Sequence, residues 1–223
     1  MKTIKGILFL TLLNSCSSIK KTERLADRGN LDACHSVVQN YLDKMDYLPE
    51  RRNPQKKIIK YSQKGISIDS TSKSSLIFYE LLSNYTKDRR LKHFYLKKAA
   101  CLGDGESQWR MGIYYLEGQE NERNKDSAIY YLKKSSIETN YKYSALANYE
   151  LGNIFFLGKI VEKDSLIALN YYKNACLCFG DNSHLPSCEK VISNYKKLNY
   201  KDTSELLLYE NVVKYLKFQK KNK

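Results

Sequence analysis

The sequence predicts an all-α fold, a right-handed α-solenoid of about five antiparallel helix pairs. Three observations support this prediction. A motif of small, apolar and aromatic residues recurs along the chain, helix-capping residues recur with it, and the 223 residues include only 3 Pro and 10 Gly. One helix pair cannot bury its own apolar side, whereas stacked pairs bury each other's. With 42% hydrophobic and 28% charged residues, the chain has the composition of a folded protein.

The repeat is clearest in two segments, residues 107–118 and 147–158, which match at a shift of 40 positions. In each, a small residue, an apolar residue and an aromatic residue follow one another at intervals of four, which places them on one face of a helix, helix A. A second helix, helix B, follows each copy. The repeat-defining residues are Met111, Gly112, Tyr115, Gly118 and Ala128 in one copy and Ala147, Leu151, Gly152, Phe155, Gly158, Asp164 and Ala168 in the next.

The helix starts support the same register independently. Good N-cap residues, whose side chains accept from unpaired backbone N–H groups, precede each helix B: Asn53, Asp88, Asn124, Asp164 and Ser204. The expected pairs are 31–46 with 54–67, 72–85 with 89–101, 104–117 with 125–137, 142–157 with 165–178, and 186–198 with 204–219. Gly112 and Gly152 lie inside helix A, where a glycine costs about 1 kcal/mol. We expect a close approach of helix B, at its small residues Ala128 and Ala168, to offset this cost.

The pattern resembles the Sel-one-like repeat (SLR) family, which is related to the tetratricopeptide repeats. The family pattern is A-x3-L-G-x2-Y-x2-G, a loop, D-x3-A and Y-Y-x-K-A, and residues 147–175 carry nearly all of it. The resemblance implies a non-catalytic scaffold that binds a protein or peptide on a concave surface. It implies no cofactor. The aromatic residues of the repeat are then expected to be core rather than ligand-stacking positions.

The N-terminus resembles that of a bacterial lipoprotein. Lys2 and Lys5 precede a short apolar run, which is too short to span a bilayer, and Leu13-Asn14-Ser15-Cys16 is similar to a lipobox. The resemblance implies a signal peptide over 1–15, lipidation of Cys16 and a membrane anchor; Ser17 favours the outer membrane in diderm bacteria. A plain signal peptide with a chance cysteine is the alternative. We expect a polar tether over 16–24, the solenoid over 25–219 and a basic tail over 220–223.

Five further cysteines would enter an oxidising compartment on export. A cysteine-rich branch of the SLR family joins the end of helix B to the next helix A, which implies a disulfide between Cys176 and Cys188, with Cys178 as a competing partner. Cys176, Cys178, His184 and Cys188 also form a zinc-like set, but their spacing matches no known zinc module, and we expect no metal.

No phosphate loop, metalloprotease motif or serine-nucleophile motif is present. We therefore expect no enzyme, with a cell-wall or β-lactam-directed hydrolase of the cysteine-rich SLR type as an alternative. The formal net charge of +14 suggests another alternative, a basic adhesin for an anionic surface polymer. Nucleic acid is not an expected partner, because the chain carries an export signal.

Overall fold

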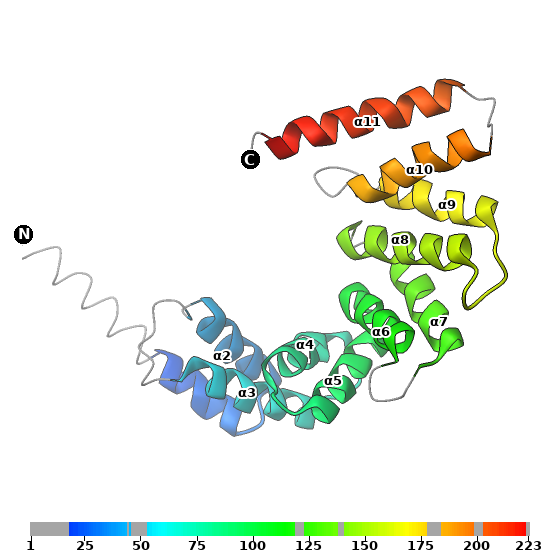
Figure 1. Ribbon diagram of the computed structural model, residues 1–223. Helices are drawn as coiled ribbons and strands as arrows, with labels where there is room; N and C mark the ends of the chain where they lie inside the picture. Colours follow the sequence, from blue (N-terminus) through cyan, green and yellow to red (C-terminus); the bar gives the residue numbers. More distant parts are fainter. Residues whose placement is uncertain are drawn as a thin grey trace, which may run out of the picture. The chain divides into compact units, whose positions relative to one another are not determined.

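The computed structural model describes residues 18–43, 45, 53–118, 123–137, 141–177, 184–198 and 203–221. These residues are almost entirely helical, and none of them belongs to a strand. The chain divides into two compact units, up to Leu102 and from Gly103 onward, which are described separately below. The predicted all-α solenoid of antiparallel helix pairs is confirmed (Figure 1).

The first unit contains two helix pairs and an additional helix over residues 18–27. Each helix packs on the next along the chain. The core shared by the first four helices includes Ala26, Val37, Ile58 and Phe78, all fully buried. The labelled elements of this unit are α2 (Leu31–Asp43), α3 (Pro54–Ile68), the 3₁₀ turn η2 (Lys73–Ser75), α4 (Leu76–Tyr85) and α5 (Arg89–Cys101).

The helix over 18–27 corrects the expected tether over 16–24. Ala26 is fully buried in the core, and Ile19, two turns earlier on the same helix face, packs partly buried against the same cluster. Glu23 accepts hydrogen bonds from Lys57 Nζ at 2.8 Å and Tyr41 Oη at 3.0 Å, which attach the helix to α3 and α2. The helical array therefore begins before residue 25.

The second unit contains three helix pairs. Consecutive helices pack on each other, and α6 also contacts α8, so that neighbouring helices A touch. The largest fully buried side chains here are Tyr172, Tyr195 and Tyr209. The elements are α6 (Gly105–Glu117), α7 (Lys125–Ser136), α8 (Tyr141–Leu157), α9 (Ser165–Cys176), α10 (Leu185–Lys197) and α11 (Thr203–Lys221). Because α11 runs to Lys221, the expected basic tail over 220–223 begins inside a helix.

Four of the five predicted caps are present. Asn53, Asp88, Asn124 and Asp164 each accept a hydrogen bond from the backbone N–H three residues ahead, at 2.8–3.0 Å. The fifth is wrong, because α11 begins at Thr203 and Ser204 lies inside it. Capping side chains satisfy otherwise unpaired backbone donors and so fix where each helix B starts.

The glycines inside helices A mark close helix packing, as expected. A Cβ atom at Gly152 would lie 2.6 Å from the Tyr172 ring, and one at Gly112 would lie 2.6 Å from Leu132 Cγ. The contacting residues are thus one turn beyond the expected Ala168 and Ala128, although both alanines are fully buried. Large side chains of helix B fill the space that each glycine leaves.

Candidate functional site

Most of the repeat-defining residues face the core. The side of each helix A that faces away from the core is therefore available to contact a partner. Met111, Gly112, Tyr115, Ala128, Ala147, Leu151, Gly152 and Ala168 are buried. Phe155 is half-buried and stacks on Tyr171 with ring centroids 5.7 Å apart, while Gly118 and Gly158 end their helices with φ of 70° and 65°. Asp164 caps α9. None of these side chains is therefore placed to recognise a ligand.

The other face of α8 carries residues 146, 149, 150, 153, 156 and 157, which are exposed or half-buried. Residues three and four apart share a helix face, so these positions form one stripe. The same register on α6 includes Trp109, Ile113 and Glu117, and on α10 it includes Glu189, Lys190 and Lys197. We call these stripes the outer A face of the second unit.

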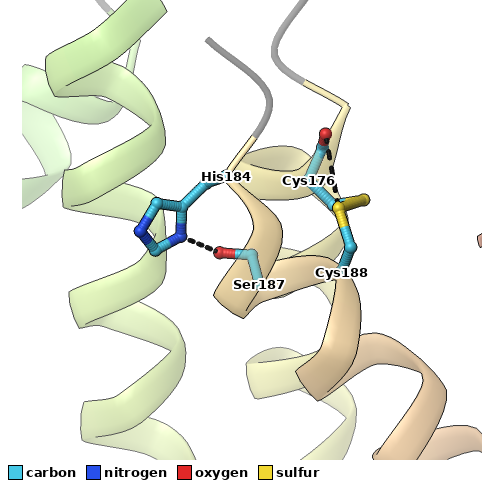
Figure 2. The surroundings of a disulfide bond; sticks show 4 residues. All are labelled: Cys176, His184, Ser187 and Cys188. Atoms are coloured by element: carbon cyan, nitrogen blue, oxygen red, sulfur yellow. Dashed lines mark hydrogen bonds between the residues drawn. A yellow bond between two sulfur atoms is a disulfide. The ribbon is translucent and has the colours of Figure 1, made fainter. Parts of the chain in front are cut away.

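The start of α10 is attached to both α9 and α8. A disulfide joins Cys176, at the end of α9, to Cys188 in α10, with the Cα atoms 4.8 Å apart (Figure 2). His184 precedes α10; its Nδ1 lies 2.7 Å from Ser187 Oγ, and its ring lies 4.8 Å from the Tyr149 ring of α8. Burial lowers the pKa of His184. These contacts fix the position of α10 relative to α8.

The disulfide is the pair that the resemblance implies, and it removes two thiolates from the zinc-like set. Cys178, the competing partner, lies outside the described residues. Among the described residues, no group of three or more His, Cys, Asp or Glu side chains is placed to hold a metal ion. Cys34 is buried and Cys101 exposed, both with free thiols, and burial raises the pKa of Cys34.

Three lysines converge on the ring of Phe156 at the end of α8. The Nζ atoms of Lys163, Lys190 and Lys197 lie 5.9, 5.4 and 5.4 Å from the centroid of this half-buried ring. Lys163 comes from the loop before α9, and the other two come from α10, two turns apart. We call these four residues the lysine–phenylalanine cluster.

The cluster carries three positive charges without a carboxylate partner in the described part of the chain. Elsewhere in the same unit, Lys173 pairs with Glu205 at 2.8 Å and Lys196 with Glu210 at 3.5 Å, whereas none of the three cluster lysines lies within 4.0 Å of a described carboxylate oxygen. Because all three Nζ atoms lie within 5.9 Å of one ring centroid, their like charges repel one another, and a ring face offsets only about 0.5–1 kcal/mol per cation at an exposed site. The arrangement is therefore suited to an anionic group.

A second group of lysines lies over an aromatic ring in the first unit, but here each lysine is paired with an acid. Lys57 and Lys60 lie 5.8 and 4.7 Å from the Tyr61 ring centroid, and each pairs at 2.8 Å with an acid of the helix over 18–27, Glu23 and Asp27. The hydrogen bond from Lys60 lowers the pKa of Asp27. We call these five residues the tyrosine cluster. Because its charges are balanced internally, we assign it a structural role.

Sequence reasoning missed both clusters. Lys190 and Lys197 are spaced for one helical face, but only the packing of α8 against α10 brings them to Phe156. Cys16, the expected lipidation site, lies outside the described residues, as do residues 1–17 as a whole. Within the described residues, no helix is both long and apolar enough to cross a bilayer.

Comparisons with known proteins agree with this architecture. The Sel1 repeat model matches residues 85–104, 105–138 and 145–178. A Sel1 repeat protein from Oxalobacter formigenes superposes with a TM-score of 0.60 at 19% identity, over 89% of this chain and 78% of that one.

A protective antigen of uropathogenic Escherichia coli with an SLR fold gives a TM-score of 0.59 at 18% identity, over 89% of this chain but only 40% of that one. No curated protein matches significantly. The two structures share the fold, and the repeat matches include the residues that predicted the helix pairs. This chain therefore carries three Sel1 repeats between residues 85 and 178, within a fold of the SLR type.

Proposed function

We propose that this protein is a lipid-anchored, non-catalytic scaffold of the bacterial cell envelope that binds a protein or peptide partner. The observation that carries the binding proposal is the outer A face of the second unit. Its helices are held in register by packed cores, and it presents exposed or half-buried apolar and charged side chains, among them Ile113, Leu157 and Lys197. Sel1 repeats generally serve protein–protein interaction, which supports the same proposal.

The anchoring proposal rests on the sequence Leu13-Asn14-Ser15-Cys16. Two or three acyl chains hold a protein stably at a membrane, whereas one chain holds it only weakly. Cys16→Ala should move the protein from the membrane fraction to the soluble fraction after an alkaline wash. Persistence of Cys16→Ala in the washed membranes would contradict lipid anchoring at this residue.

The binding proposal is tested by crosslinking in intact cells of a bacterium that carries the gene. Full-length chain with a C-terminal tag is purified, and the crosslinked proteins are identified by mass spectrometry. The test variant Ile113→Ser/Leu157→Ser removes apolar side chains from the outer A face. The matched control Tyr130→Ser/Leu166→Ser removes exposed apolar side chains, 56% and 60% exposed, from helices B.

We expect one protein to be enriched by the wild type and the control but not by the test variant. Circular dichroism of both variants should show unchanged helix content, because all four side chains lie outside the fully buried core. Equal enrichment by all three proteins, or no specific enrichment by the wild type, would contradict a partner bound at the outer A face.

A further inference from the structure

We propose that the lysine–phenylalanine cluster binds an acidic segment of the partner protein, with carboxylates at the three lysines and an apolar side chain against Phe156. This inference rests on the proposed function and specifies the partner chemistry at one end of the outer A face. The cluster combines a half-buried aromatic ring with three cations, which suits neighbouring acidic and apolar residues.

The acids that α10 and α11 place near Lys190 and Lys197 are engaged with other lysines. Glu189, adjacent to Lys190 on α10, pairs with Lys217 of α11 at 2.8 Å. Lys196, adjacent to Lys197, pairs with Glu210, which also lies in α11. The side of α10 that faces α11 thus has balanced charge. The side that faces Phe156 carries Lys190 and Lys197, and neither has a carboxylate partner among the described residues. A bound carboxylate would relieve the repulsion between these lysines.

The three lysines are held in place by the structure around them. The disulfide and the His184–Tyr149 contact hold α10 beside α8, so Lys190 and Lys197 project from a fixed helix. Lys163 is held by the preceding turn, because a Cβ at Gly158 would lie 2.7 Å from Lys163 Cβ and the next residue's N–H bonds to Phe155 O at 3.0 Å. Groups held in place before binding lose less entropy when the ligand arrives.

Acids on the same side of the second unit favour a peptide over an anionic polymer or lipid surface. Glu150 lies on the same stripe of α8, six residues before Phe156, which is about 9 Å along a helix. Burial raises the pKa of Glu150, and the charge of Glu117 on α6 adds to this. A row of phosphates or a bilayer laid along the stripe would meet these two carboxylates, whereas a peptide with only one acidic end would not.

The spacing also suggests the form of the peptide. An extended chain advances about 3.3–3.6 Å per residue, so about three residues cover the rise of α8 between Glu150 and Phe156. A segment with a basic residue at one end and acidic residues about three positions later would match both charges of the stripe. Replacing the acidic residues of such a peptide with basic residues should abolish its binding.

The test uses fluorescence anisotropy with the full-length protein in detergent micelles. The probe is the fluorescein-labelled peptide Lys-Gly-Gly-Leu-Glu-Glu, and its counterpart Lys-Gly-Gly-Leu-Gln-Gln lacks the carboxylates. The cluster variant is Lys163→Gln/Lys190→Gln/Lys197→Gln. The control Lys98→Gln/Lys134→Gln/Lys142→Gln removes the same charge from three lysines that each lie over a different ring, at 5.6, 5.8 and 5.0 Å.

We expect the cluster variant to bind the acidic peptide about tenfold more weakly, which corresponds to about 1.4 kcal/mol. The control should change affinity less than about twofold, and the Gln peptide should bind the wild type as weakly as the acidic peptide binds the cluster variant. No binding to the wild type at about 1 mM peptide, or equal losses in the two variants, would overturn the inference. Vesicles containing phosphatidylglycerol test the lipid alternative: cluster-dependent vesicle binding without peptide binding would also overturn it.

The failure of this inference differs from failure of the proposed function. If the crosslinked partner is retained by the cluster variant while Ile113→Ser/Leu157→Ser loses it, the acidic-segment inference is wrong and the scaffold proposal stands. If the wild type enriches no partner through its outer A face, the scaffold proposal fails whatever the peptides do.

Discussion

The tyrosine cluster of the first unit and the lysine–phenylalanine cluster of the second use the same contact in opposite ways. Both place lysines over one aromatic ring. In the tyrosine cluster, Glu23 and Asp27 arrive on a neighbouring helix and balance the charge, so the cluster attaches that helix to the core. In the other cluster, no described carboxylate arrives. The charge balance around the contact, rather than the contact itself, distinguishes a structural site from a candidate binding site.

The largest effect that would separate the two clusters comes from the disulfide, because only the lysine–phenylalanine cluster depends on it. Cys176→Ala/Cys188→Ala opens a link between residues 12 apart in sequence, which should lower the free energy of unfolding of the second unit by about 3 kcal/mol. Urea unfolding followed by circular dichroism measures this. Cys101→Ser, at an exposed free thiol, is the control and should leave the transition unchanged.

The same disulfide variant should weaken binding of the acidic peptide, because α10 would no longer be held covalently beside α9. Unchanged stability and unchanged peptide affinity after removal of both cysteines would show that packing alone positions Lys190 and Lys197.

The next effect is the loss of a balancing acid from the tyrosine cluster. Glu23 accepts from both Lys57 and Tyr41, and its side chain is only 16% exposed. Glu23→Ala leaves those donors without this acceptor and should lower the free energy of unfolding of the first unit by about 1–2 kcal/mol. Chemical denaturation measures the change, with Glu162→Ala, an exposed acid, as the control. An equal effect of the two substitutions would refute the structural role of the tyrosine cluster.

A smaller difference in stability is expected when one lysine is replaced in each cluster. Lys57→Gln removes a charge that has a partner and should lower stability by about 0.5–1 kcal/mol. Lys190→Gln removes a charge that only repels its neighbours in the cluster and should leave stability unchanged or raise it by up to about 0.5 kcal/mol.

Salt should weaken this contrast, because both effects are electrostatic. At 1 M salt the Debye length falls to about 3 Å, so both differences from the wild type should shrink. Thermal unfolding of the two variants at low and high salt is the measurement. A destabilising Lys190→Gln at low salt would mean that the lysine has a stabilising partner in the folded chain.

The helix pairs were predictable because the repeat encodes each of them locally. The caps Asn53, Asp88, Asn124 and Asp164 and the spacing from Ala147 to Phe155 need no knowledge of other elements. The helix over 18–27 was missed because its sequence is mostly polar; it is held by Ala26 and Glu23, whose partners lie on α2 and α3.

The candidate site was missed for a related reason. Lys163, Lys190 and Lys197 belong to separate segments, and their convergence on Phe156 is a tertiary contact. A repeat pattern records the residues that pack in every copy. It does not record residues such as Phe156, whose counterparts at a shift of 40 are Leu116 and Lys196.

The smallest effect is in pH dependence, where two carboxyls should give opposite slopes. Asp27, in the tyrosine cluster, has a lowered pKa because Lys60 donates to it, so its stabilisation is present above the unfolded pKa and is lost as the pH falls through the folded value. Glu150, on the outer A face, has a pKa raised by burial and by Glu117. Its folded form binds the proton more tightly, so stability falls as the pH rises from the unfolded pKa to the raised folded value.

Asp27→Asn should therefore lower the melting temperature at pH 7 but lose its effect in acid, whereas Glu150→Gln should raise it at pH 7 and lose its effect in acid. Each change should be no more than about 0.5 kcal/mol, since the Asp27 side chain is 48% exposed and Glu150 is only partly buried. Melting temperatures of both variants from pH 2 to 8 provide the measurement. Slopes of the same sign would mean that Glu150 has a cationic neighbour, and a peptide's basic end would then have no unbalanced acid to meet.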